Sequence, residues 1–337
     1  MTNLGVVLNI HSYNNTHVLL FSSTISVMFH ETLEFYEKGR EKLDNLKTYA
    51  IYVDASVDID NRYIEENDIH FIPMKYMIDD KEYVMDRQQT EEELEHFYKC
   101  MKDGAITGTS QITPYTYDQI FRAEAEKGHD VLYLCLSSGL SSTYSSSLNA
   151  AQAVMEDYPE AKIESVDTLG ATGGVGLLLM QAIKGREEGK TVEENAAYLR
   201  QIAPDIGFWF MVEDLEYLKR GGRISATAAF AGNVLNLKPV LKINDEGKLI
   251  NISKQRGVAR AVKYLIECYE GAHDDTISSD VIVAHAVCKQ RAEKMRDEIL
   301  RINPNAKVQI CPMGPVIGSH TGPGFAAVIH FGNRNFR

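Results

Sequence analysis

Hydroxyl side chains concentrate in two segments that follow or adjoin predicted strands. The first group comprises Thr107, Thr109 and Ser110, and the second comprises Ser137, Ser138, Ser141, Ser142 and Thr143. Serine and threonine hydroxyls, together with loop N–H groups, bind an anionic head group without a formal positive charge. Turns and helix N-caps use the same residue types. Because both groups adjoin strands, we expect them to reach one sheet edge and to form a ligand site.

Two glycine-containing runs in the second half of the chain carry further polar groups. Gly318-Ser319-His320-Thr321-Gly322-Pro323-Gly324 offers an imidazole among glycines that permit close backbone approach. Around Gly221-Gly222, Lys219, Arg220 and Arg223 bring positive charge into an acidic chain. Cations are also favoured at a helix C-terminus that stops at glycine, so this second run indicates a helix end, a surface for an acidic or phosphorylated partner, or both.

Motifs for catalysis on this chain are absent from the sequence. Residues 185–191 place three residues between their glycines, where a phosphate loop needs four, and neither a GxSxG nucleophile elbow nor an HExxH zinc motif occurs. The ten histidines lack metal-ligand spacing. We therefore expect no catalytic residue, no metal site and no cofactor.

An enzymatic alternative remains open at this stage. Ser141 or Ser138 could act as a nucleophile with His320 as its base, oriented by Asp54 or Asp167. That arrangement predicts an acyl hydrolase.

Composition narrows the class of protein further. The chain has 337 residues and a formal net charge of −12, which argues against broad binding to nucleic acid or to anionic membranes. Five cysteines without CxxC spacing favour reduced thiols. No apolar run reaches the roughly 18 residues of a membrane span, and the N-terminus lacks the basic start of a secretory signal. We expect a cytoplasmic protein without stable membrane insertion.

Strands and helices alternate along the first half of the chain, which predicts an α/β domain with a parallel sheet. Strands are expected at residues 49–53, 69–77 (broken by Pro73), 81–85, 130–136 and 162–166. Helices are expected at 91–101, 115–126, 173–188 and 191–203, and a hydroxyl-rich loop at 137–147 is expected to run into a helix that ends at residue 155. Thr90 and Glu93 form a capping box for the first of these helices. Residues 108–111 are expected to form a polar loop.

The second half predicts an α/β domain with a mixed sheet, because a hairpin interrupts the alternation. Strands are expected at 208–212, 238–244, 248–254, 280–285, 307–311 and 325–331, with helices at 214–220, 227–234, 256–269 and 289–301 and a loop at 312–324. We place the domains at 47–200 and 201–337, after a poorly packed N-terminal extension at 1–46.

Six stretches resemble the DegV family of fatty-acid-binding proteins. They lie at residues 54–56, 109–111, 136–144, 214–225, 232–239 and 314–324, in family order, and the resemblance covers residues 48–331. It implies a two-domain α/β fold that holds one long-chain fatty acid, such as palmitate or oleate, between the domains. Members of the family serve as binding subunits that present the carboxylate to a separate ATP-dependent fatty acid kinase subunit, which makes an acyl phosphate for phospholipid synthesis.

Carried onto this chain, the resemblance assigns the carboxylate contacts to Thr109 and Ser141, with Ser138 as second choice for the serine and with Ser110 and His320 close by. Arg220 and Arg223 are the candidates for the kinase-facing surface. Residues 173–180 and 226–237 are candidate tunnel walls. A lipid chaperone or sensor without a kinase partner is a third interpretation.

Overall fold

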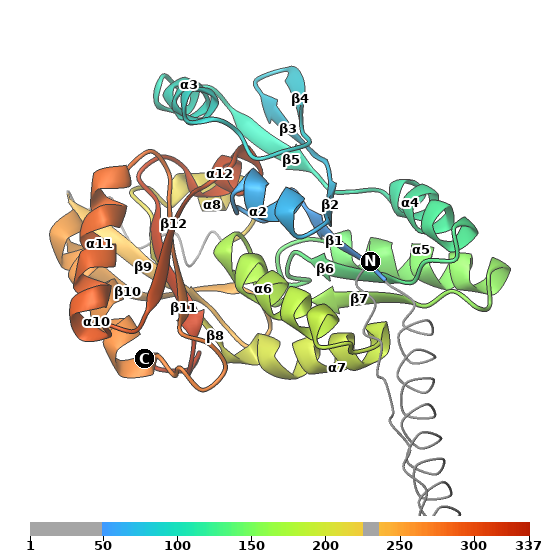
Figure 1. The fold of residues 1–337 in the computed structure, drawn as a ribbon. Helices are drawn as coiled ribbons and strands as arrows, with labels where there is room; N and C mark the ends of the chain where they lie inside the picture. Colours follow the sequence, from blue (N-terminus) through green and yellow to red (C-terminus); the bar gives the residue numbers. More distant parts are fainter. Residues whose placement is uncertain (1–48, 225–235) are drawn as a thin grey trace, which may run out of the picture. The chain divides into compact units, whose positions relative to one another are not determined.

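The computed structural model describes residues 49–224 and 236–337, which belong to one compact unit of the chain, Thr48–Arg337. The expected extension at 1–46, the expected helix at 227–234 and all but the end of the candidate wall 226–237 lie outside the described residues. Within them the fold combines a parallel sheet, a larger mixed sheet and a small antiparallel sheet with surrounding helices (Figure 1).

The parallel sheet of the first half has the strand order β2-β1-β6-β7. Its strands are β1 (Ala50–Asp54), β2 (Ile69–Ile72), β6 (Val131–Cys135) and β7 (Ile163–Asp167). The two central strands β1 and β6 are buried along their length and are apolar except for Asp54 at the end of β1, as expected for parallel strands covered on both faces. Helix α5 (Thr143–Asp157) packs on β7 and on α4 (Pro114–Glu126), whereas α7 (Val192–Ile202) contacts β6 and β7.

The mixed sheet of the second half has the order β10-β9-β8-β13-β11-β12, in which β11 and β12 form the parallel pair. Its strands are β8 (Ile206–Met211), β9 (Leu237–Ile243), β10 (Leu249–Arg256), β11 (Asp280–His285), β12 (Lys307–Pro312) and β13 (Ala326–Phe331). Helices α10 (Val258–Ala272) and α11 (Lys289–Ile302) contact strands of this sheet. The prediction of a parallel-sheet half followed by a mixed-sheet half is confirmed.

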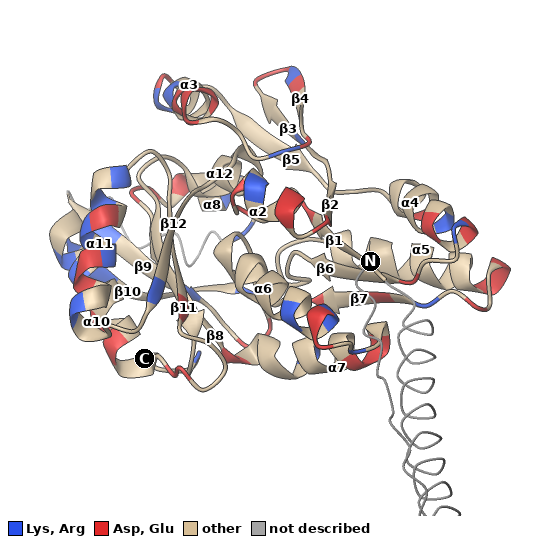
Figure 2. Ribbon diagram, viewed as in Figure 1, with Lys and Arg blue, Asp and Glu red and all other residues tan. Residues whose placement is uncertain are grey.

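Helix α6 (Gly173–Glu187) contacts strands of both large sheets, β1 and β6 on one side and β11 and β13 on the other. Most of its residues are buried, because a helix between two sheets has little surface left for water. Gly173 lets the helix start approach the second sheet, since a Cβ there would lie 2.5 Å from a methyl carbon of Ile282. Charged residues gather mainly on helices such as α3, α10 and α11, while the central strands carry few (Figure 2).

The small antiparallel sheet, of order β4-β3-β5, was not predicted as a separate sheet, although a strand at 81–85 and one over 69–77 were expected. Its strands are β3 (Met74–Ile78), β4 (Lys81–Met85) and β5 (Thr107–Ser110). Pro73 does more than break one strand, because β2 before it and β3 after it belong to different sheets. The expectation of a loop at 108–111 was wrong: Tyr76 pairs with Thr109 and Lys75 with Ser110 across the β3–β5 ladder.

Two further helices lie beside this sheet. Helix α3 (Glu91–Lys102) begins with the expected capping box, in which the Thr90 hydroxyl accepts from the Glu93 N–H and the Glu93 carboxylate accepts from the Thr90 N–H. Phe97 on α3 meets Tyr76 on β3 edge to face, with ring centroids 5.6 Å apart. Residues 312–324 were expected to be a loop, but they contain helix α12 (Pro315–Thr321), which contacts α3, β3 and β5.

Short helices complete the described elements. These are α2 (Asn61–Glu66), the 3-10 turn η1 (Ala203–Asp205) and α8 (Glu216–Arg220). The change from the first large sheet to the second falls between β7 and β8, across α6, α7 and η1.

Candidate functional site

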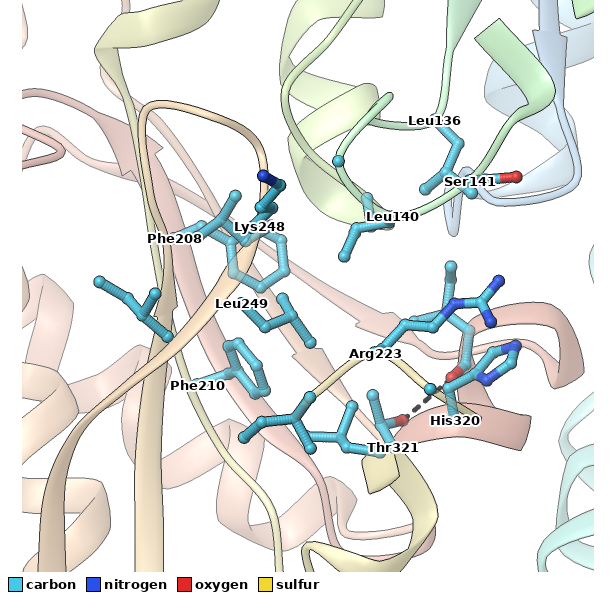
Figure 3. A pocket seen from close by; sticks show the side chains of 18 of the residues that line it. Leu136, Leu140, Ser141, Phe208, Phe210, Arg223, Lys248, Leu249, His320 and Thr321 are labelled. Atoms are coloured by element: carbon cyan, nitrogen blue, oxygen red, sulfur yellow. Dashed lines mark hydrogen bonds between the residues drawn. The ribbon is translucent and has the colours of Figure 1, made fainter. Parts of the chain in front are cut away.

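A cavity of about 1500 Å³ is lined by residues from both halves of the described chain. Its apolar wall comes from the second sheet and from loops of the first half (Figure 3). The main apolar contributors are Leu136, Leu140, Ala171, Phe208, Phe210, Leu218, Ile243, Leu249 and Phe325. Phe208 and Phe210 point the same way because alternate residues of β8 share a face. Such a surface excludes water and suits a long apolar ligand.

One end of the cavity is polar, and Thr109 and His320 meet there. The Thr109 hydroxyl lies 2.8 Å from Nε2 of His320. β5 presents Thr109 and α12 presents His320, so two elements expected to be loops position this pair. Burial and the positive charge of Arg223 lower the pKa of His320 to about 4. The imidazole is therefore neutral at physiological pH.

Gly221 packs directly against this imidazole. A Cβ at position 221 would lie 2.1 Å from Nδ1 of His320, which no van der Waals contact allows. The Gly221 carbonyl also accepts a hydrogen bond from the Arg223 guanidinium. The glycine turn after α8 thus holds two polar side chains of the cavity in place.

For the fatty acid that the sequence resemblance implies, Gly221→Ala is expected to weaken binding about tenfold or more. The methyl group displaces His320, which positions Thr109, and a hydrogen bond from Thr109 to a charged carboxylate would be worth about 1.5–3 kcal/mol. Gly108→Ala is the matched control. Gly108 adjoins Thr109 on β5, but a Cβ there would meet the flexible end of Met77 at 3.4 Å. Titration with a fluorescent long-chain acid measures both variants; equal affinities would contradict this role for Gly221.

The serine-rich loop between β6 and α5 supplies the other polar side chains. Ser141 Oγ accepts from the Thr143 N–H at 3.2 Å and lies 2.6 Å from the Thr143 hydroxyl. Ser141 therefore binds the N–H of the first residue of α5 and also lines the cavity. Ser138 is exposed at the cavity wall, and its N–H donates to Asp167 at 3.1 Å.

This loop is docked on the β9–β10 turn of the second half. The Ser137 hydroxyl donates to the Gly247 carbonyl at 2.9 Å and accepts from the Gly139 N–H at 3.2 Å. A Cβ at Gly139 would lie 2.5 Å from the Glu246 carbonyl oxygen, so the two backbones touch. The position of Ser141 thus depends on a contact between the two halves of the chain.

Arg223 lines the same cavity, which the sequence analysis did not expect. In Figure 3 its side chain lies beside His320, and Ser141 lies across the cavity from them. Desolvation lowers the pKa of the guanidinium, and the described residues provide it with no carboxylate partner. The polar end of the cavity therefore contains a half-buried cation in addition to its hydroxyl and imidazole groups. Arg220 differs, since it is exposed and lies over the Tyr217 ring at 5.2 Å from the ring centroid.

The hydrolase geometry is not formed among the described residues. His320 is bonded to Thr109 there and not to Ser138 or Ser141, and neither aspartate reaches it. Asp54 accepts from Tyr133 and from the Ser56 N–H, while Asp167 accepts from the N–H groups of Ser138 and Leu169.

Residues 49–224 and 236–337 contain neither a candidate metal site nor a candidate membrane span. No three His, Cys, Asp or Glu side chains in this part of the chain could hold a metal ion together. None of its helices combines the length and apolarity needed to cross a bilayer.

The structure brings most of the predicted site residues to one cavity. Its lining includes Thr109, Ser110, Ser138, Ser141, His320 and Arg223. Thr107 instead donates to the Ser319 carbonyl at 3.2 Å, so its role is structural. Within the described lining, the candidate wall 173–180 contributes nothing, although Ala171 just before it does. The sequence predictions did not include Phe208 and Phe210 among the lining residues. Their alternation on the expected strand at 208–212 places both side chains on one face and could have indicated an apolar wall.

Comparison with known proteins gives a consistent result. A family model described as an uncharacterised protein of the DegV family matches residues 48–332. A DegV domain-containing protein of Streptococcus pyogenes is 37% identical over 291 residues, which covers 86% of this chain and 99% of that protein.

Solved structures show the same fold. A DegV family protein from Thermus thermophilus, described by its fatty acid binding, is 27% identical with a TM-score of 0.74, over 85% of this chain and 99% of that one. The fatty acid kinase B3 protein of Streptococcus pneumoniae, loaded with linoleic acid, shares the fold at 19% identity and a TM-score of 0.73, over 84% and 99% of the two chains.

Proposed function

The chain belongs to the DegV family, and from that premise we propose that it binds one long-chain fatty acid, such as palmitate or oleate, in the cavity described above. The acyl chain lies against Phe208, Phe210 and Leu249, and the carboxylate lies at Thr109 and Ser141. In this proposal the ligand sits between an α/β domain of residues 47–200 and another of residues 201–337. The observation that carries the proposal is one cavity with an apolar wall and a polar end built on the Thr109–His320 pair.

The apolar wall supplies the affinity. Burying a methylene group gains about 0.8 kcal/mol, so a sixteen-carbon tail gains roughly 10 kcal/mol before the costs of ordering the ligand. A carboxylate resists burial unless it is hydrogen-bonded, so the polar end must supply donors.

In one arrangement of the hydrogen bonds, both hydroxyls can donate to the carboxylate. Neutral His320 can donate from Nε2 to the Thr109 oxygen, which leaves the threonine proton for the carboxylate. The Thr143 hydroxyl and N–H can both donate to the Ser141 oxygen, which leaves the serine proton for the same ligand. In this arrangement His320 donates to Thr109 and Thr143 donates to Ser141. With the other imidazole tautomer, Thr109 would donate to His320 and would offer only lone pairs to the ligand.

The proposal also includes a protein partner. We propose that the chain presents its ligand to a separate ATP-dependent kinase subunit, which forms the acyl phosphate, and that this chain itself catalyses no reaction. The polar end carries Arg223, and the exposed Arg220 is the last residue of α8, just before the glycine turn that leads to Arg223. We assign these two cations to the partner-facing side, where they complement an anionic reaction centre. Arg220→Glu should lower acyl-phosphate formation by that kinase while leaving the bound lipid unchanged.

Native mass spectrometry of the purified protein tests the function, followed by organic extraction and identification of the released lipid. We expect one fatty acid per chain. An empty protein that also fails to take up added oleate or palmitate would refute the proposal. A bound acid without phosphorylation by the kinase subunit of the same genome would leave a lipid chaperone or sensor.

A further inference from the structure

A buried carboxyl group lies outside the cavity, at the start of the helix that carries His320. Asp58, in the connection from β1 to α2, is 2% exposed, and its Oδ1 accepts from the Gly314 N–H at 2.7 Å. Gly314 is the N-cap residue of α12. The residue before it is also held, because the Tyr98 hydroxyl of α3 donates to the Met313 carbonyl at 2.9 Å. Two side chains from the first half thus fix where α12 begins.

Helix α12 transmits this position to the ligand end of the cavity. His320 is six residues beyond Gly314, or about 9 Å along a helix that rises 1.5 Å per residue. Hydrogen bonds from the Gly318 N–H to Gly314 and from the Gly322 N–H to Gly318, both 2.9 Å long, run through the helix. Gly314 is closely surrounded, since a Cβ there would lie 2.6 Å from the end of the Met85 side chain and 3.0 Å from Oδ1 of Asp58. We therefore expect a change in the hydrogen bond between Asp58 and the Gly314 N–H to shift His320, whose imidazole orients Thr109.

The surroundings of Asp58 bring the pKa of its carboxyl group close to physiological pH. Burial raises the pKa of Asp58 to about 7, against the opposing effects of the Thr172 hydroxyl and the Gly314 N–H, which favour the ionised form. The other titratable groups that interact with this region are Tyr98 from α3, Cys311 from β12 and the exposed Asp60. Burial raises the pKa of Tyr98 well above its usual value and that of Cys311 to about 12. The described groups that set the pKa of Asp58 include no cation.

We propose that Asp58 is a positioning residue whose ionisation couples ligand binding to a proton, by setting how firmly Gly314, and through α12 His320, is held. The proposal rests on the proposed function. A carboxylate accepts an N–H hydrogen bond about twice as strongly as a neutral acid does, so ionised Asp58 keeps His320 on Thr109. Ligand binding therefore favours ionised Asp58, and by reciprocity it releases a proton.

The test measures affinity between pH 6 and pH 8.5 with hexadecane sulfonate, a probe whose own charge is constant over this range. Wild-type protein should bind about fivefold more tightly at pH 8 than at pH 6. His320, with its pKa of about 4, stays neutral throughout. Calorimetry in two buffers of different ionisation enthalpy should show proton release on binding near pH 7.

Variants separate Asp58 from its neighbours. Asp58→Asn should bind with an affinity that does not change with pH, whereas Asp60→Asn, at an exposed carboxylate two residues away, should keep the wild-type profile. Thr172→Val removes a hydroxyl that favours the ionised form, so it should move the midpoint to higher pH.

The direction of the Asp58 pKa shift predicts the stability of the Asp58→Asn variant. A raised carboxyl pKa adds stability that is fully present below the unfolded pKa near 3.8 and is lost as pH rises through about 7. Asp58→Asn stays neutral, so it should be at least as stable as wild type at pH 8. Tight wild-type binding without pH dependence or proton release would overturn the role of Asp58 alone. Wild-type protein that binds neither the probe nor oleate at any pH would overturn the proposed function and this inference with it.

Discussion

Thr109→Val combined with Ser141→Ala is expected to weaken palmitate or oleate binding at least about a hundredfold while the fold survives. Each hydroxyl donates to a charged carboxylate in the proposed complex, and one such hydrogen bond is worth about 1.5–3 kcal/mol. Both oxygens lie at the polar end of one cavity, so the ligand loses two donors together. Competition against a fluorescent long-chain acid measures the loss.

A nearby hydroxyl controls for unspecific damage. Ser145→Ala removes an exposed hydroxyl from the first turn of α5, which bonds the Ser142 carbonyl and does not line the cavity. This control should bind as wild type does. Unchanged binding in the double variant would end the assignment of Thr109 and Ser141.

Arg334→Met is expected to destabilise the fold by roughly 3 kcal/mol, because it removes a buried donor to several carbonyl groups and each buried acceptor left unsatisfied costs about 1–3 kcal/mol. The Arg334 side chain is 3% exposed. Its guanidinium donates to the carbonyls of Ile206 (2.9 Å), Asn244 (3.3 Å), Leu169 (3.3 Å) and Ala203 (2.8 Å). Leu169 and Ala203 lie after β7 and in η1, at the end of the first half. Ile206 begins β8, and Asn244 lies in the β9–β10 turn of the second sheet. Methionine leaves all four without this donor, although the Asn244 carbonyl keeps a hydrogen bond from the Gly247 N–H and the Ala203 carbonyl keeps one from the Ile206 N–H.

Arg337→Met provides the comparison three residues later. Arg337 is more exposed and pairs with Glu267 at 3.2 Å, an arrangement worth about 1 kcal/mol or less. Urea unfolding monitored by circular dichroism gives both free energies of unfolding. Similar losses in the two variants would show that the four carbonyls do not depend on Arg334.

Hydrophobic patterning and capping predicted much of the secondary structure. The runs at 49–53 and 130–136 became central strands because parallel strands covered on both faces are apolar throughout. The Thr90–Glu93 box placed the start of α3 correctly, since this cap is local to four residues. The mixed sheet of the second half followed from the hairpin around Gly247.

The elements that hold the site were harder to predict because tertiary contacts define them. Strand β5 is short and polar and contains a glycine, and its pairing partner β3 lies about 30 residues earlier. Helix α12 contains a glycine and a serine and is packed by α3 and β5. The location of Arg223 in the cavity depends on the path of the turn after α8. Residue types therefore indicated the chemistry of the site, whereas the elements beneath Thr109 and His320 required the structure.

The apolar cavity has a consequence for the life of the protein in the cell. Under the proposed function the acyl chain completes the interior, so the loaded protein is more stable than the empty one by mass action; at a free ligand concentration of a hundred times Kd the difference is about 2.7 kcal/mol. Proteases act on transiently opened molecules, whose population falls as stability rises. Empty molecules are then degraded faster than loaded ones, and the amount of this carrier in the cell follows the supply of its lipid.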